Sequence, residues 1–69
     1  MTTTIDARGL SCPQPVILAR SAVQGGKLPV EVLVDSVTSR ENVRRMAERS
    51  GLKVQVEQVG DEFRLTISR

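Results

Sequence analysis

The chain has one cysteine and no histidine among its 69 residues, and this combination most limits how it can fold. A single thiol cannot form a disulfide within the chain. Structural zinc takes four ligands, nearly always cysteine and histidine, so we expect no metal site and no bound cofactor. Domains of this length are marginally stable without such a crosslink. The chain must therefore rely on an apolar core, which its 39% of hydrophobic residues can supply.

The charge of the chain is nearly balanced, with ten lysines and arginines against eight acidic residues and a net charge of +2. This balance is not the signature of a nucleic-acid-binding surface. No stretch approaches the roughly 18 apolar residues of a membrane span, and the first ten residues lack the apolar run of a signal peptide. A lone free cysteine is typical of a reducing compartment. We expect one cytoplasmic domain over residues 1–69, acting as a monomer away from membranes.

The first half of the chain predicts a strand, a helix and a second strand. The first strand lies in "TTTIDA" and ends near residues 6–8. Residues 13–24 have helical apolar spacing, followed by the helix-ending pair Gly25–Gly26. Ile17 falls off the apolar stripe, so it is either partly exposed or part of a contact surface. The second strand is "PVEVLVDS", with three valines on one side. The stripe of the helix consists of Val16, Leu18, Ala19, Ala22 and Val23.

The second half predicts another helix and a hairpin. Thr38 and Glu41 have the spacing of a capping box at the start of this helix. Its apolar stripe is Val43, Met46 and Ala47, and Gly51 ends it. The strands "LKVQVEQV" and "EFRLTISR" are joined at Gly60–Asp61. A two-residue turn there places Val56 opposite Leu65 and Val54 opposite Ile67.

The predicted order of elements is β-α-β-α-β-β, which indicates the α+β class. Two right-handed crossovers place both helices on the same face of a four-stranded mixed sheet, as a two-layer α/β sandwich. The other face carries mostly polar residues and is expected to be solvated.

Four arginines cluster on the second predicted helix, interleaved with Glu41 and Glu48. They are Arg40, Arg44, Arg45 and Arg49. We favour a solvated helix face over a dedicated docking or anion-binding surface. If this helix begins near the cysteine, however, Arg40 and Arg44 are positioned to steer an acidic partner surface.

Cys12 is the strongest candidate for chemistry, within the stretch "GLSCPQP". If the first helix starts at Pro13, Cys12 is its N-cap, where the helix dipole favours a thiolate. Such positions lower a cysteine pKa from about 8.5 into the range of about 3.5–7.5. Pro13 and Pro15 stiffen the first turn, and Arg8 adds positive charge nearby. The competing interpretation is a small buried cysteine, although an N-cap at a loop corner is rarely deep core.

A lone activated thiol is compatible with sulfur transfer but not with acyl transfer by a Cys-His pair or with dithiol exchange. The absence of histidine argues against acyl transfer by a Cys-His pair, and position 15 is proline where a Cys-x-x-Cys motif has its second thiol. A single thiolate can still attack a persulfide, hold its sulfane sulfur and yield that sulfur to another thiol.

The stretch "DARGLSCPQPV", with its Cys-Pro-x-Pro core, resembles the TusA/SirA-type sulfur-carrier family, and "VDSVTSRENVRRMAERSG" extends the similarity along the chain. "ENVRRMAERSG" is most similar to the N-terminal domain of the YedF branch. The resemblance implies a sheet order of 1-2-4-3 with the last strand antiparallel. It implies Cys12 as the sulfur-bearing nucleophile of a sulfurtransferase-type carrier. The supporting motif positions are Asp6, Gly9, Pro13, Pro15 and Asp35.

The family resemblance also implies two kinds of partner. A cysteine desulfurase or rhodanese-like protein donates persulfide sulfur, and a DsrE-like or other thiol protein accepts it. Two alternatives remain open. One is a nucleic-acid- or protein-binding regulatory module, against which stands the single aromatic residue, Phe63. The other is a redox regulator that forms a mixed disulfide through Cys12.

Overall fold

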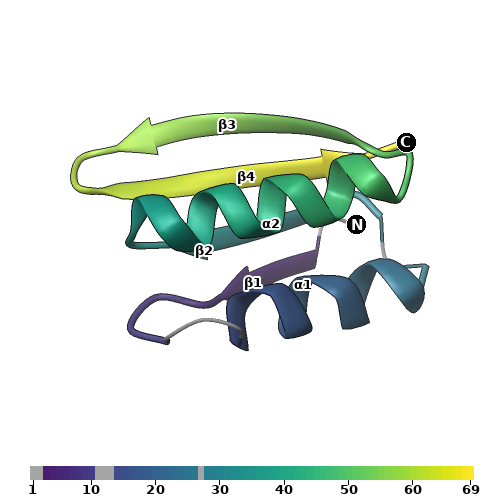
Figure 1. Cartoon of the computed structure of the whole chain (residues 1–69), viewed down its shortest axis with the longest axis horizontal. Coiled ribbons are helices and arrows are strands. Elements are labelled where there is room, and N and C mark those ends of the chain that lie inside the picture. Colours follow the sequence, from purple (N-terminus) through teal and green to yellow (C-terminus); the bar gives the residue numbers. More distant parts are fainter. Residues whose placement is uncertain (1–2, 11–13, 27) are drawn as a thin grey trace.

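The computed structural model describes residues 3–10, 14–26 and 28–69, and shows two helices and four strands within them (Figure 1). The order confirms the predicted β-α-β-α-β-β succession. The elements are β1 (Thr3–Asp6), α1 (Gln14–Gln24), β2 (Val30–Val34), α2 (Val37–Arg49), β3 (Lys53–Val59) and β4 (Glu62–Ser68).

The strands form one mixed sheet in the order β1-β2-β4-β3. β1 and β2 are parallel, whereas β4 lies between β2 and β3 and is antiparallel to both. α1 and α2 run side by side over one face of this sheet (Figure 1), where their buried residues join those of the strands in one core cluster. The α+β two-layer sandwich and its 1-2-4-3 sheet order are thus confirmed.

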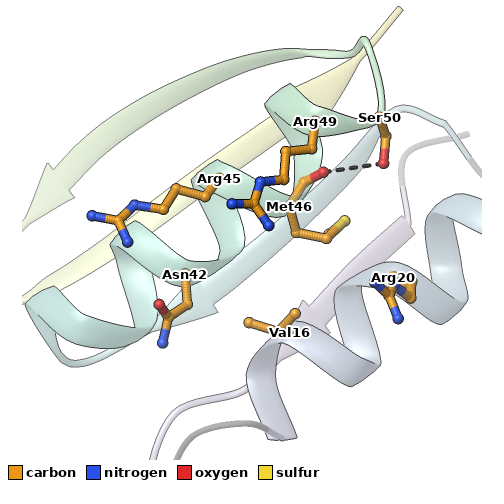
Figure 2. A pocket seen from close by; sticks show the side chains of 7 residues that line it. All are labelled: Val16, Arg20, Asn42, Arg45, Met46, Arg49 and Ser50. Atoms are coloured by element: carbon orange, nitrogen blue, oxygen red, sulfur yellow. Dashed lines mark hydrogen bonds between the residues drawn. The ribbon is translucent and has the colours of Figure 1, made fainter.

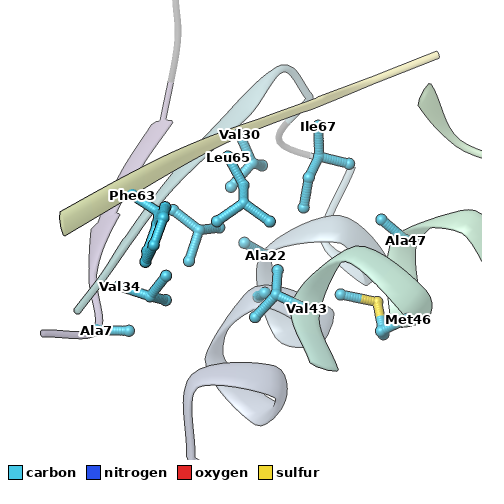
Figure 3. Packing of buried hydrophobic residues seen from close by; sticks show 12 residues of the cluster. Ala7, Ala22, Val30, Val34, Val43, Met46, Ala47, Phe63, Leu65 and Ile67 are labelled. Carbon is cyan, nitrogen blue, oxygen red and sulfur yellow. The ribbon is translucent and has the colours of Figure 1, made fainter. Parts of the chain in front are cut away.

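The core is centred on the valines of β2 (Figure 3). Val30, Val32 and Val34 are fully buried and alternate with the half-buried Glu31 and Leu33. This strict alternation is expected for a strand with only one face covered by helices. In β4 the same face presents two further fully buried side chains, Leu65 and Ile67, which are the register partners of Val32 and Val30.

The final hairpin has the register that its turn predicts. Val54 is opposite Ile67 and Val56 is opposite Leu65, and Gly60 adopts a φ of 63°, which suits glycine in a tight turn. Val56 is nevertheless 41% exposed, although it lies on the helix-covered side of the sheet. β3 is an edge strand of the sheet, so its apolar side is only partly covered.

Helix α2 confirms the predicted apolar stripe but not the predicted cap. Val43, Met46 and Ala47 are buried. The N-cap is Ser36, which has an extended backbone and whose hydroxyl accepts a hydrogen bond from the Ser39 N–H at 3.1 Å. The Thr38–Glu41 capping box was therefore wrong. β2 ends at Val34, and the chain turns into the helix before Thr38 is reached.

Helix α1 buries a narrower stripe than predicted. Pro15, Ala19 and Ala22 are buried, whereas Leu18 is 39% exposed, so its assignment to the core was wrong. The buried positions are spaced i, i+4 and i+7, and their small side chains allow the helix to lie close to the sheet. Ile17 is 57% exposed, in agreement with its position off the predicted stripe. Two large apolar residues of α1 therefore face solvent.

The difference between buried and exposed isoleucines gives a direct test of this packing. Ile67→Val removes one methyl group from a fully buried site, and should lower the free energy of unfolding by about 0.5–1.5 kcal/mol. Ile17→Val makes the same change at an exposed site and should alter it by less than about 0.5 kcal/mol. Urea titration followed by circular dichroism measures both. Equal effects of the two substitutions would contradict the described core.

Candidate functional site around the cysteine motif

A short turn carries the chain from β1 toward the cysteine motif. The Ala7 N–H donates to the Leu33 carbonyl at 2.9 Å, which extends the parallel pairing by one residue beyond Asp6. Ala7 is buried, and its carbonyl accepts a hydrogen bond from the Leu10 N–H at 3.4 Å. The approach to the motif is thus attached to the end of the parallel strands.

Two of the motif positions meet in this turn. Asp35 follows β2 directly, and its Oδ2 accepts a hydrogen bond from the Gly9 N–H at 2.8 Å. Gly9 has a φ of 78°, a conformation that side chains disfavour, although a Cβ there would meet no atom within 4 Å. Glycine is therefore required by the backbone angle and not by lack of space. This bond joins residues that are 26 positions apart.

Arg8 forms a clamp with two carboxylates at the same edge. Its Nε and Nη2 donate to Asp6 Oδ1 and Oδ2 at 2.9 and 2.8 Å, and its Nη1 donates to Glu62 Oε1 at 3.1 Å. The side-chain hydrogen bonds from Arg8 lower the pKa of Asp6 from 3.8 to about 2. The same carboxylates raise the pKa of Arg8 above its usual range. The charge of Arg8, expected to act near Cys12, is thus balanced by Asp6 and Glu62.

The central residues of the motif, Cys12 and Pro13, lie outside the described residues, and with them the predicted N-cap position of the thiol. The structure describes the segments on either side. Leu10 ends the turn attached to β2, and α1 begins at Gln14 with Pro15 buried in its first turn.

The two arginines predicted to dock partners have different surroundings. The guanidinium of Arg40 lies 4.7 Å from the centre of the Phe63 ring, and its Nε contacts Glu41 at 3.3 Å. Arg44 is held between Glu41 and Glu48, at 2.7 and 3.1 Å. These contacts raise the pKa of Arg44 and lower that of Glu41. Arg44 is therefore largely neutralised by its own helix.

The structure adds a groove between α1 and α2 that the sequence did not predict (Figure 2). The close-up shows Val16 and Met46 between the two helices, Arg20 on the α1 side, and Arg45 and Arg49 on the α2 side. Only the tertiary structure brings Arg20 toward the arginines of α2. Asn42 and Ser50 complete the lining.

A second, smaller hollow lies next to the motif. Leu10, Gln14, Ile17 and Leu18 line it, and its surface is mainly apolar. The sequence indicated only the exposure of Ile17. The exposed Leu18, together with Leu10 from the turn, makes Ile17 part of a larger apolar surface and not an isolated exposed side chain.

Within the described ranges, no group of three histidine, cysteine, aspartate or glutamate side chains is placed to hold a metal ion. In the same part of the chain, neither helix is long and apolar enough to cross a membrane.

Comparisons with known proteins agree on one relationship. A family model described as Sulfurtransferase TusA matches residues 3–69. The chain is also similar to a solved SirA-like protein from Desulfitobacterium hafniense, with 39% sequence identity and a TM-score of 0.85. That match covers 97% of this chain and 95% of the other. No curated protein matches the chain.

The ion pair of Asp6 predicts a pH-dependent stability. Its folded pKa of about 2 lies below the unfolded value, so the pair stabilises the fold above about pH 4, and this contribution is lost between about pH 4 and pH 2. Asp6→Asn should lower Tm by a few degrees at pH 6, and the difference from wild type should vanish toward pH 2. Asp61→Asn, in the exposed hairpin turn, is the control and should leave the pH dependence of Tm between pH 6 and pH 2 as in the wild type. A Tm difference for Asp6→Asn that is equal at pH 6 and pH 2 would contradict the assignment.

The bond between Asp35 and Gly9 predicts local protection of one amide. Asp35→Ala removes a carboxylate acceptor and should speed hydrogen exchange of the Gly9 N–H on the order of tenfold. Exchange measured by NMR checks this at a single residue. Asp61→Ala serves as the matched control and should leave Gly9 unaffected. Unchanged exchange in Asp35→Ala would show that the bond does not hold the turn.

Proposed function

The chain belongs to the TusA sulfurtransferase family, and on this premise we propose that it is a sulfur carrier that accepts persulfide sulfur on Cys12 and relays it to an acceptor protein. Family membership and the similarity to a SirA-like structure support the carrier role. The persulfide on Cys12 and the relay are the steps that we add.

The observation that carries the proposal is the placement of the single thiol of the chain. In sequence, Cys12 lies two residues after Leu10 and two residues before Gln14. The turn up to Leu10 is attached to the parallel strands by backbone bonds and by Asp35. Helix α1, which begins at Gln14, is anchored in the core by Pro15 and Ala19. The segments on both sides of the thiol in the sequence are therefore anchored to the core, which is what a site that presents one reactive group requires.

The proposed transfer needs one nucleophile and no external oxidant. The Cys12 thiolate attacks the terminal sulfur of a donor persulfide, so that a new S–S bond forms at Cys12. The S–S bond of the donor breaks, and the cysteine sulfur of the donor leaves as a thiolate. In the second step an acceptor thiolate attacks the terminal sulfur on Cys12, which returns to its thiolate. The sulfane sulfur keeps its oxidation state throughout.

We further propose the classes of partner and the setting. The donor is a cysteine desulfurase or a rhodanese-like protein, and the acceptor is a DsrE-like or other thiol protein. Exchange with partner proteins is consistent with membership of the family. Assignment to the YedF branch and a cytoplasmic location complete the proposal.

Mass spectrometry tests the carrier function directly. The protein is incubated with a cysteine desulfurase and cysteine, and in parallel with inorganic polysulfide. Intact mass should rise by one sulfur atom, and peptide mapping should place this atom on Cys12. Addition of dithiothreitol should remove it, because a thiol cleaves the persulfide.

The control is Cys12→Ser, which should show no adduct from either donor while keeping the Tm of the wild type to within a few degrees. Absence of an adduct on wild-type Cys12 from every sulfane donor would overturn the proposal. A mixed disulfide or a disulfide-linked dimer as the only product would favour the redox alternative.

A further inference from the structure

We infer that the groove between α1 and α2 is the docking site for an acidic segment of the protein that donates sulfur to Cys12. The groove is defined by Val16, Arg20, Arg45, Met46 and Arg49, with Asn42 and Ser50 at its borders. That the bound protein is the sulfur donor rests on the proposed function. The affinity of the groove for acidic segments stands on the structure alone.

Positive charge is concentrated in this groove, and no carboxylate of the described residues pairs with it. Arg20, Arg45 and Arg49 are exposed, and none of them forms an ion pair within the described residues. The other arginines of α2 differ, because Glu41 and Glu48 hold Arg44, and Glu41 and Phe63 hold Arg40. Arg45 and Arg49 are also four positions apart on one helix face, where like charges repel. An incoming anion would relieve this repulsion.

The floor of the groove favours a peptide over a nucleic acid. Val16 and Met46 lie between the arginines (Figure 2), so the surface alternates apolar and cationic contacts. An apolar side chain flanked by carboxylates matches this pattern, and guanidinium groups pair with carboxylates through two parallel hydrogen bonds. Proteins that bind single-stranded nucleic acids combine a cationic groove with aromatic side chains on which bases stack. The chain has one aromatic residue, Phe63, which is almost fully buried.

The position of the groove connects it to the cysteine. Val16 is in the first turn of α1 and lies four residues after Cys12 in the sequence. The groove continues from there to Arg49 and Ser50 at the end of α2 (Figure 2). An acidic segment bound along it would hold the body of the partner at the end of α1 that follows the cysteine motif.

Binding is tested with the synthetic peptide Asp-Glu-Leu-Glu-Asp in NMR titrations of the full chain. Amide shifts should concentrate at Val16, Arg20, Arg45, Met46 and Arg49, and binding should weaken with added salt. Arg45→Gln with Arg49→Gln should weaken binding by about 10-fold. Lys53→Gln with Arg69→Gln is the matched control, because it removes the same charge at exposed positions outside the groove. It should change the affinity by less than about twofold.

Failure of the peptide to bind, or equal weakening by both double variants, would overturn the inference. Shifts at the groove with oligouridylate and none with the peptide would likewise overturn it, in favour of a nucleic-acid ligand. Far-UV circular dichroism of both variants shows whether the fold is kept. Glutamine is a good helix former, so α2 should persist.

A kinetic comparison separates this inference from the proposed function. Loading of Cys12 from a cysteine desulfurase should slow by about 10-fold in Arg45→Gln with Arg49→Gln. Loading from polysulfide, which needs no docking, should keep the rate of the wild type. Equal desulfurase rates in variant and wild type would overturn the groove as the site for the sulfur partner and leave the carrier function intact. No loading of the wild type from either donor would overturn the carrier function, whatever the peptide binding shows.

Discussion

The parallel pairing of β1 with β2 is the interaction on which the rest of the structure depends. It brings the carboxyl ends of both strands to one edge of the sheet, where the chain enters the turn before the cysteine motif and the start of α2. Only this arrangement allows Asp35, after β2, to accept the Gly9 N–H after β1. The alternating valines of β2 bury one side of the strand and so determine which face the helices cover. The packing of the core therefore determines how the turn before the cysteine motif is placed beside the start of α2.

The distribution of charge separates two kinds of arginine. Arg8 and Arg64 pair with carboxylates of the strands, and Arg44 pairs with carboxylates of its own helix. Exposed pairs of this kind stabilise the fold only modestly, and they also neutralise the surface locally. In the part of the chain that the structure describes, the arginines of the helix groove have no such partners, and they surround apolar side chains. A nearly neutral protein can in this way present one cationic surface.

Sequence patterns predicted most of the fold because each element has a clear periodicity. The valines of β2, the stripe of α2 and the register of the hairpin are all local signals, and the structure confirms them. The two wrong predictions, the core position of Leu18 and the capping role of Thr38, concern places where several residues of similar chemistry were available. Leu18 is as apolar as a core residue, but the close approach of α1 to the sheet favours small alanines. Ser36, Thr38 and Ser39 can all cap a helix. Ser36 is the cap because β2 ends at Val34 and the helix begins at Val37.

The sequence by itself determined the order of elements, the apolar face of each one and the single thiol available for chemistry. These follow from residue type and spacing along one segment, and they need no knowledge of distant contacts. Only the tertiary structure decided which charges are paired and which are not. Arg20 and Arg49 come from helices separated by a strand, and Arg8 meets Glu62 from the far end of the chain. Such pairings depend on how the layers pack, because a charge is neutralised by its neighbours in space and not by its neighbours in sequence.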